Sequence, residues 1–359
     1  MKLEEGLSLR SATALLFVFY VGYVGIHYGA VGAPADVPIS MLLGLLMSVP
    51  MLLIFGRLTR LLPGRNLFEM LDYGFGRVIS YGVSGLYFIY FLILASFVLG
   101  QIEFVRIVSL PHTPLLVLCL LFFGVAAYFA HRGVLSMGKW SVLMIIIVVA
   151  IAVLLSLLSI SNLRISNLLS LEFSRNEALL RGGYQFMVSP LGAGVVLLAL
   201  LGRSTKWVSF YKVFFLGASL ATLFFLWIFL RDLSVLGSAG MERLTYPAYH
   251  AASGIQVGAG GRVESLVTVW VLLSALTMLA VCLYAAAGGL RRMTGRQKNT
   301  GMLIPATVLA LGFTAFLGMG FAEGFLLELM YLRYAPVVQG GIPVLLWLVT
   351  EIKMKRQSV

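Results

Sequence analysis

Charged residues are scarce in this sequence: they make up 11% of its 359 residues, whereas 60% are hydrophobic. A soluble domain carries about 25% charged residues, so this composition excludes an ordinary globular protein. The few charges are mostly basic, giving a net charge of +12. In a soluble protein that excess would suggest nucleic acid, but here it fits cytoplasmic loops that face anionic lipid headgroups. We therefore expect a polytopic protein of the lipid bilayer that binds no nucleic acid.

Cysteine is almost absent, and so are the motifs of enzymes. Cys119 and Cys282 both lie in apolar runs, which predicts free buried thiols and no disulfide framework. The four histidines lie in four different regions and form no metal-ligand pattern. There is no Walker loop, no H-E-x-x-H, no G-x-S-x-G and no carboxylate pair at a useful spacing. These absences predict a protein that is not an enzyme and holds no cofactor or metal.

Long apolar runs are abundant. A transmembrane helix needs roughly 20 apolar residues, and by that rule the chain forms a single integral membrane domain over residues 1–359, with no cleaved signal peptide. The predicted transmembrane segments, called spans 1 to 10, lie near residues 10–31, 38–62, 79–108, 114–130, 137–159, 184–202, 207–233, 263–290, 301–320 and 334–352. Most Lys and Arg residues fall in the loops that share a side with the N-terminus. The positive-inside rule then places both termini in the cytoplasm.

Span 6 combines an apolar run with residues that disrupt helices. Within Tyr184–Leu201, its middle contains Ser189, Pro190, Gly192 and Gly194. Proline removes a backbone donor and clashes with the preceding turn, and glycine makes non-helical dihedrals accessible. A break at membrane depth survives only where it is buried in protein or lines a cavity. Such breaks form the ligand sites of many transporter folds.

Span 1 carries a second interruption. Gly22, Gly25, Gly29 and Gly32 precede Pro34, and two interpretations stay open: a small-residue seam for close helix packing, or a helix break that partners the one in span 6. If ten spans divide as five plus five, spans 1 and 6 occupy corresponding positions in two inverted halves. The predicted fold class is therefore an all-α, LeuT-like 5+5 inverted repeat with broken helices 1 and 6.

A few polar residues remain within the spans. Glu103 and Arg106 are spaced for a structural pair on one helix face, while His27 fits either an ordinary polar contact or a proton carrier. Three tyrosines present polar tips on apolar bodies, and each fits either the core or a cavity lining: Tyr87, Tyr90 and Tyr284.

Five short motifs, taken in order, resemble one known family. They are LPHTP at Leu110–Pro114, AAYFAHRG at Ala126–Gly133, SPLG at Ser189–Gly192, LTYP at Leu244–Pro247 and LYAAA at Leu283–Ala287. Over nearly its full length the chain is similar to the B subunit of spore nutrient-germinant receptors, the GerAB-type proteins of the amino acid–polyamine–organocation superfamily.

The resemblance implies a ten-span LeuT-like protein of the spore inner membrane. It implies an A subunit and a lipoprotein C subunit as partners, and a small germinant, commonly an amino acid, as ligand. By position, the ligand pocket would include the break of span 1, the turn of span 6 and the inner faces of spans 3 and 8. The predicted ligand-binding residues are Gly22, Tyr23, Gly25, Val98, Ser189, Pro190, Leu191, Gly192 and Tyr284.

One departure from the family pattern bears on function. The acidic residue that commonly follows P-x-G in span 6 is Ala193 here. Either carbonyls hold the ligand's amine, or the ligand is not a simple amino acid, or ion coupling has been abandoned. Tyr23, where relatives often carry a small residue, suggests a smaller or differently shaped pocket. We expect a germinant-sensing subunit; the alternative is a permease for an amino acid or related solute. A scaffold without a ligand would leave the paired breaks unexplained.

Overall fold

The computed structural model describes residues 7–25, 33–169, 176–202, 208–255, 262–295, 300–317 and 321–357. Across these ranges the regular secondary structure is helical, with no strand. Seven of the described helical segments are long and apolar enough to cross a membrane, and three shorter apolar helices, Leu9–Val24, Leu115–His131 and Gly301–Phe316, accompany them. The predicted all-α polytopic fold is confirmed.

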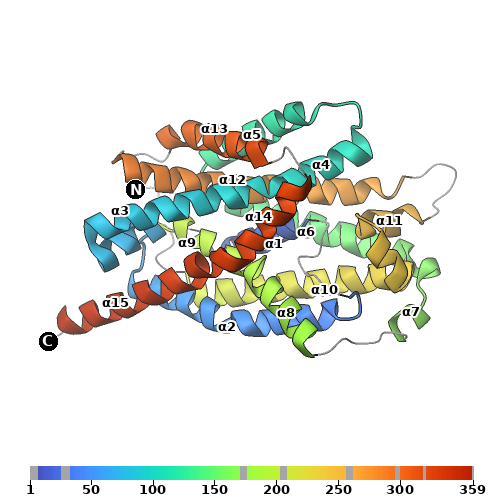
Figure 1. Cartoon of the computed structure of the whole chain (residues 1–359), viewed down its shortest axis with the longest axis horizontal. Helices are drawn as coiled ribbons and strands as arrows, with labels where there is room; N and C mark the ends of the chain where they lie inside the picture. Colours follow the sequence, from blue (N-terminus) through green and yellow to red (C-terminus); the bar gives the residue numbers. More distant parts are fainter. Residues whose placement is uncertain are drawn as a thin grey trace.

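Most of the long helices run in roughly one direction, and the last helices before the C-terminus cross them obliquely (Figure 1). In the first half of the chain the helices are α1 (Leu9–Val24), α2 (Val37–Leu61), α3 (Leu67–Ser96), α4 (Val98–Ser109), α5 (Leu115–His131), α6 (Val134–Leu158), η1 (Ile160–Asn162) and α7 (Ser166–Leu169). The second half contains α8 (Asn176–Val188), η2 (Leu191–Val195), α9 (Val196–Leu200), α10 (Phe210–Arg243), α11 (Pro247–Ser253), α12 (Ser265–Thr294), α13 (Thr300–Leu317), α14 (Phe321–Pro336), η4 (Val337–Gly341) and α15 (Ile342–Gln357).

Helix α1 is the centre of the bundle. It packs against α6, α10 and α12, and every residue from Ser11 to Val24 is buried. A helix that is apolar on all sides is stable only when it is enclosed. The helices around it pair further, α3 with α12 and α2 with α8. The polar groups at the end of α1 are therefore held inside the protein, away from lipid and water.

Four chain interruptions shape the interior. Helix α1 ends at Gly25, whose φ of +56° lies outside the range that other residues adopt readily. Span 6 breaks after α8, where a turn at Ser189 and Pro190 leads into the 3-10 helix η2. Span 3, predicted as one helix, is divided at Phe97 into α3 and α4. Span 10 contains a π-helix, η4, directly after Pro336. The last two interruptions were not predicted.

The turn before α3 has a clear local cause. Asn66 caps the helix: its Oδ1 accepts the Glu69 N–H at 3.0 Å, and its own N–H donates to Glu69 Oε2 at 3.1 Å. This capping box fixes where the helix starts. Gly76, with φ +76° and ψ 172°, then separates a short first segment from the long rest of α3. The chain between spans 2 and 3 therefore forms a turn followed by a short helix.

Two smaller predictions are also confirmed. Cys119 and Cys282 are free and buried, and Arg106 Nη2 lies 3.7 Å from Glu103 Oε1 as an i,i+3 pair. His27 lies outside the described residues. The structure does not test the division of the chain into two repeat regions at the predicted boundaries.

Candidate functional site

The end of α1 is held by an amide side chain from α4. Gln101 Nε2 donates to the main-chain carbonyls of Gly22 and Tyr23, at 3.2 Å in each case. The last carbonyls of a helix lack intrahelical donors, so this amide satisfies two groups that would otherwise be unpaired in the interior. Gln101 is 3% exposed, and its Oε1 is buried without a hydrogen-bond partner. The break of span 1 therefore presents an unused acceptor.

Side chains from other helices donate hydrogen bonds to the free backbone carbonyls at the break of span 6. The hydroxyl of Tyr20 donates to the Leu191 carbonyl at 3.1 Å, and Gln339 Nε2 donates to the Val188 carbonyl at 3.0 Å. The Tyr23 and Ser189 hydroxyl oxygens lie 3.3 Å apart, so the two breaks touch each other. The predicted pairing of the broken spans thus has a direct contact in the structure.

Gln339 is the centre of a small polar cluster. Besides Val188 O, its Nε2 contacts the hydroxyl oxygens of Tyr90 at 2.9 Å and Tyr331 at 2.8 Å. Those two hydroxyls lie 3.1 Å from each other. Gln339 is 1% exposed, and both tyrosines are buried. The cluster joins α3, α8, α14 and η4 at the level of the span 6 break.

Aromatic rings enclose this cluster. Phe97, at the division between α3 and α4, makes edge contacts with Tyr23 (centroids 5.6 Å apart) and with Tyr331 (5.1 Å). Tyr331 in turn stacks on Tyr90 at 6.1 Å. Rings with offset or edge geometry attract one another and also attract cations. The site is consequently apolar in its walls, with neutral hydrogen-bonding groups in its centre.

The predicted ligand-binding residues fall into two groups according to their neighbours. Tyr23, Ser189, Leu191 and Gly192 meet at the two breaks, as the contacts above show, and a Cβ atom built at Gly192 would stand 2.1 Å from Gln339 Oε1. Gly25 faces Gln101, with a Cβ position 2.7 Å from Nε2. Their roles toward a ligand remain predictions.

The other predicted residues have different neighbours. Gly22 packs on the backbone of α12: its Cβ position is 2.2 Å from the Ser274 carbonyl oxygen, which is the close approach of a small-residue seam. Val98 and Pro190 are buried, and Tyr284 is partly buried beside the core. These three stay predictions as ligand contacts.

No group of three or more His, Cys, Asp or Glu residues occurs in the part of the chain that the structure describes. On α12, the Ser274 hydroxyl donates to Trp270 O at 2.5 Å, and Thr277 Oγ1 accepts Trp140 Nε1 at 3.1 Å. Ala193 is fully buried.

Three functional candidates were missed by the sequence reasoning: Gln101, Gln339 and Tyr331. The two amides carried a usable signal, because uncharged hydrogen-bonding side chains are costly in apolar spans unless they have partners. Their partners are backbone carbonyls 78 to 151 residues away along the chain. The identity of those partners depends on the fold.

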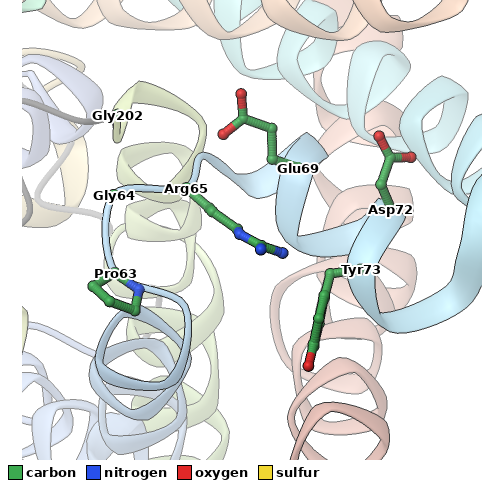
Figure 2. Close-up of a pocket in the computed structure, with 7 residues that line it drawn as sticks. All are labelled: Pro63, Gly64, Arg65, Glu69, Asp72, Tyr73 and Gly202. Carbon is green, nitrogen blue, oxygen red and sulfur yellow. The ribbon is translucent and has the colours of Figure 1, made fainter. Parts of the chain in front are cut away.

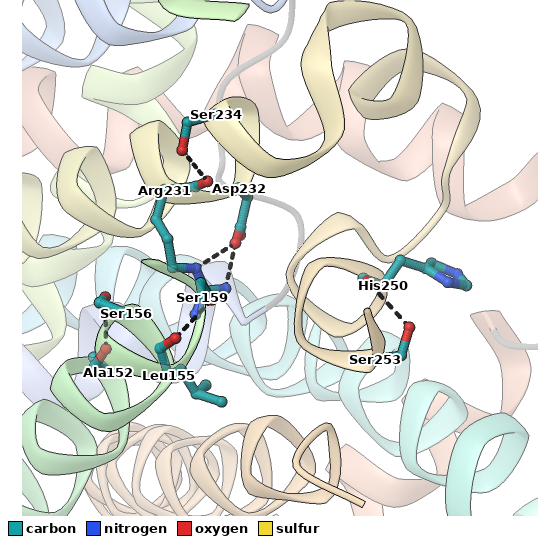
Figure 3. A network of polar contacts seen from close by, with 9 residues as sticks. All are labelled: Ala152, Leu155, Ser156, Ser159, Arg231, Asp232, Ser234, His250 and Ser253. Carbon is teal, nitrogen blue, oxygen red and sulfur yellow. Dashed lines mark hydrogen bonds and ion pairs between the residues drawn. The ribbon is translucent and has the colours of Figure 1, made fainter. Parts of the chain in front are cut away.

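A buried ion pair lies in α10 (Figure 3). Arg231 Nε donates to Asp232 Oδ1 at 2.7 Å, and the two side chains are 3% and 0% exposed. Arg231 lies near the end of predicted span 7, and its burial is a finding of the structure. Ser234 in the same helix donates to the Arg231 carbonyl at 2.7 Å. A buried pair of this kind is costly to break by removing one partner.

A further polar region lies where α15 ends, beside the α2–α3 connection. In Figure 1 this is the end of the molecule that lies away from α7 and α11. A hollow of about 830 Å³ opens there, and Arg65 extends across it so that its guanidinium lies 4.7 Å from the centroid of the Tyr73 ring (Figure 2). Arg292 Nε donates to Asp72 Oδ1 at 2.9 Å, and Lys353 Nζ donates to the Tyr73 carbonyl at 2.9 Å. These contacts tie the start of α3 to α12 and α15.

Comparison with solved structures places the fold among membrane transporters. The chain is similar to Mhp1, a nucleobase-cation-symport-1 family transporter, in a closed conformation with bromovinylhydantoin bound (TM-score 0.68, 16% identity, 96% of this chain and 78% of that one). It is also similar to a Na⁺-coupled sialic acid symporter in a substrate-bound outward-open state (0.67, 14%, 97% and 82%). A third is a manganese transporter of Eremococcus coleocola (0.54, 14%, 95% and 76%). At these identities the likeness establishes the LeuT-like fold alone.

Sequence comparison identifies the family. A comparison with curated proteins gave no significant match. A family profile described as "Spore germination protein" matches residues 7–317, which is most of the chain and includes both broken spans with their shared contact. The chain belongs to the spore germination protein family of permease-like integral membrane proteins.

Proposed function

We propose that this chain is the germinant-sensing membrane subunit of a spore germination receptor. A small nutrient, amino acid-like in character, binds between the breaks of spans 1 and 6 and triggers germination. The spore inner membrane is the location, both termini are cytoplasmic, and the A subunit and lipoprotein C subunit are the partners.

The observation that carries this proposal is the unpartnered Oε1 of Gln101. A buried acceptor without a donor is destabilising by about 1–3 kcal/mol, and a donor from a bound ligand would remove that cost. This oxygen belongs to the amide that holds the end of α1. A ligand donor placed there would be held by span 3 and span 1 together, next to the Tyr23–Ser189 contact with span 6.

The chemistry of the breaks favours sensing over transport. Ala193 occupies the position where the family commonly carries an acid, so the break of span 6 lacks the coupling charge at this position. A carrier driven by an ion gradient needs a group that binds the ion in step with the solute. A sensor needs only a ligand that binds one conformation more tightly than the other. The permease alternative keeps its support from the transporter-like fold.

The test compares binding with uptake in one preparation. The purified chain is placed in proteoliposomes and screened with a mixture of amino acids and nucleosides, by thermal shift for binding and by isotope uptake for transport. We expect a stabilising shift without concentrative uptake. Gln101→Leu should abolish the shift, while Ser156→Ala, which removes only a hydroxyl bonded within its own helix to Ala152 O, should leave it intact. Saturable, concentrative uptake would instead establish the permease.

A further inference from the structure

The main-chain carbonyl of Val188 lies at the break of span 6. Helix α8 ends at this residue, and the carbonyls of a last helical turn lack intrahelical donors. Inside a membrane protein an unpaired carbonyl costs several kcal/mol. The Gln339 amide fills this need with its Nε2 at 3.0 Å. The break of span 6 therefore already contains an occupant, which belongs to the chain itself.

The π-helix explains how Gln339 reaches this point. In η4 the wider turn directly after Pro336 inserts an extra residue into span 10, and such bulges often mark functional positions. The turn leaves Val337 exposed and Gln339 buried. Tyr87 on α3 fixes the turn from outside the cluster, by donating its hydroxyl to the Val338 carbonyl at 2.9 Å. The π-helical turn of η4 thus places the Gln339 side chain at the break of span 6.

Three acceptor oxygens surround the Gln339 nitrogen, which is one more than an amide group can donate to. Val188 O, Tyr90 Oη and Tyr331 Oη lie 3.0, 2.9 and 2.8 Å from Nε2. An amide –NH₂ carries two protons, so it can donate to only two of the three at once. A primary ammonium carries three protons, one for each oxygen.

We propose that these three oxygens form a subsite for a primary ammonium group, and that Gln339 is its resident competitor. This inference rests on the proposed function, because it assigns the ligand class of the same site: a small solute with a primary amine. The ammonium takes Val188 O and both tyrosine oxygens, and the Gln339 side chain leaves. Displacing Gln339 loosens span 10 from span 6, which is the change in helix arrangement that a sensor needs.

The experiment uses the full chain in nanodiscs, with methylammonium and trimethylammonium chloride as probes at matched ionic strength and thermal stabilisation as the readout. Gln339→Ala vacates the subsite, so its half-saturating methylammonium concentration should fall about tenfold relative to wild type, the effect of removing one competing hydrogen bond. Gln339→Met keeps the space filled and should bind neither probe. Ser156→Ala removes only a hydroxyl that bonds to Ala152 O within its own helix, and should behave as wild type.

Trimethylammonium, with a single N–H, should bind the Gln339→Ala protein at least tenfold more weakly than methylammonium. Equal binding of the two amines, or equal methylammonium binding by wild type and Gln339→Ala, would overturn the proposal. If Gln339→Ala does not fold, adding Tyr90→Phe to wild type decides instead: loss of the methylammonium preference supports the subsite, and an unchanged preference contradicts it.

These outcomes are separate from those of the proposed function. Methylammonium selectivity without binding of any amino acid or nucleoside would support the subsite and overturn the germinant-sensing role. Binding of an amino acid with no discrimination between the two amines would do the opposite.

Discussion

The two helix breaks differ in how their backbone groups are satisfied. In span 6 the carbonyls of Leu191 and Val188 receive donors from Tyr20 and Gln339. In span 1 a single amide, Gln101, serves two carbonyls and keeps its own oxygen unpaired. One break is filled by the protein, and the other retains unused hydrogen-bonding capacity.

Gly22 in span 1 and Gly192 in span 6 differ in the kind of atom that surrounds them. A side chain at Gly22 would meet the backbone of Ser274, whereas one at Gly192 would meet the end of the Gln339 side chain. A backbone neighbour cannot move without shifting its helix, but a side chain can adopt another rotamer. We infer that span 1 is fixed to α12, while the span 6 break borders a replaceable group. The following predictions test this difference.

The largest effect is expected from Gly22→Ala. Its new methyl group would stand 2.2 Å from the Ser274 carbonyl oxygen, so α1 and α12 must separate. Overpacking of this kind typically costs about 1–3 kcal/mol, and more where backbone is involved. We expect a melting temperature several degrees below wild type in detergent and nanodiscs.

Gly124→Ala is the matched control, because Gly124 lies in α5 with nothing within 4 Å of its Cβ position. Replacing an exposed helical glycine by alanine should raise stability by up to about 1 kcal/mol. If Gly22→Ala melts with the Gly124→Ala protein, the α1–α12 contact is not close-packed.

An intermediate effect is expected from Gln101→Leu. The change removes the donors to the Gly22 and Tyr23 carbonyls and leaves two buried acceptors, which should cost about 1–3 kcal/mol. Tyr20→Phe removes one donor at the other break, to Leu191 O, and should cost about 1 kcal/mol. Melting curves of the two variants, measured together, show which break contributes more to stability. A larger loss for Tyr20→Phe would reverse the comparison.

The sequence predicted the breaks because their causes are local. Pro190 and the neighbouring glycines disrupt a helix wherever they stand, and the turn at Asn66 follows from its own capping box. The lengths of the hydrophobic runs are enough to predict the apolar spans. The order of the short motifs predicted a family, and the profile match supports it. Local chemistry was sufficient for the fold class and for the location of span 6.

The occupants of the breaks could not be predicted in this way. Gln339 reaches Val188 through a π-turn and a contact across 151 residues, and neither follows from periodicity. The division of span 3 at Phe97 lacks a glycine or proline at that residue. The burial of Arg231 beside Asp232 depends on the helices that the fold packs around them. These features come from tertiary packing, which selects among the conformations that the local sequence allows.

The smallest effect is expected from Ser189→Ala. Its hydroxyl makes a 3.3 Å contact with Tyr23 Oη, near the long end of the hydrogen-bond range, so the loss in stability should be below about 1 kcal/mol. A change in melting temperature within a degree or two of wild type would agree with this. The same variant should nevertheless alter ligand response, since this contact joins the two breaks directly. If Ser189→Ala lowers stability as much as Gln101→Leu, the contact between the breaks holds the fold together, and the two breaks cannot move independently.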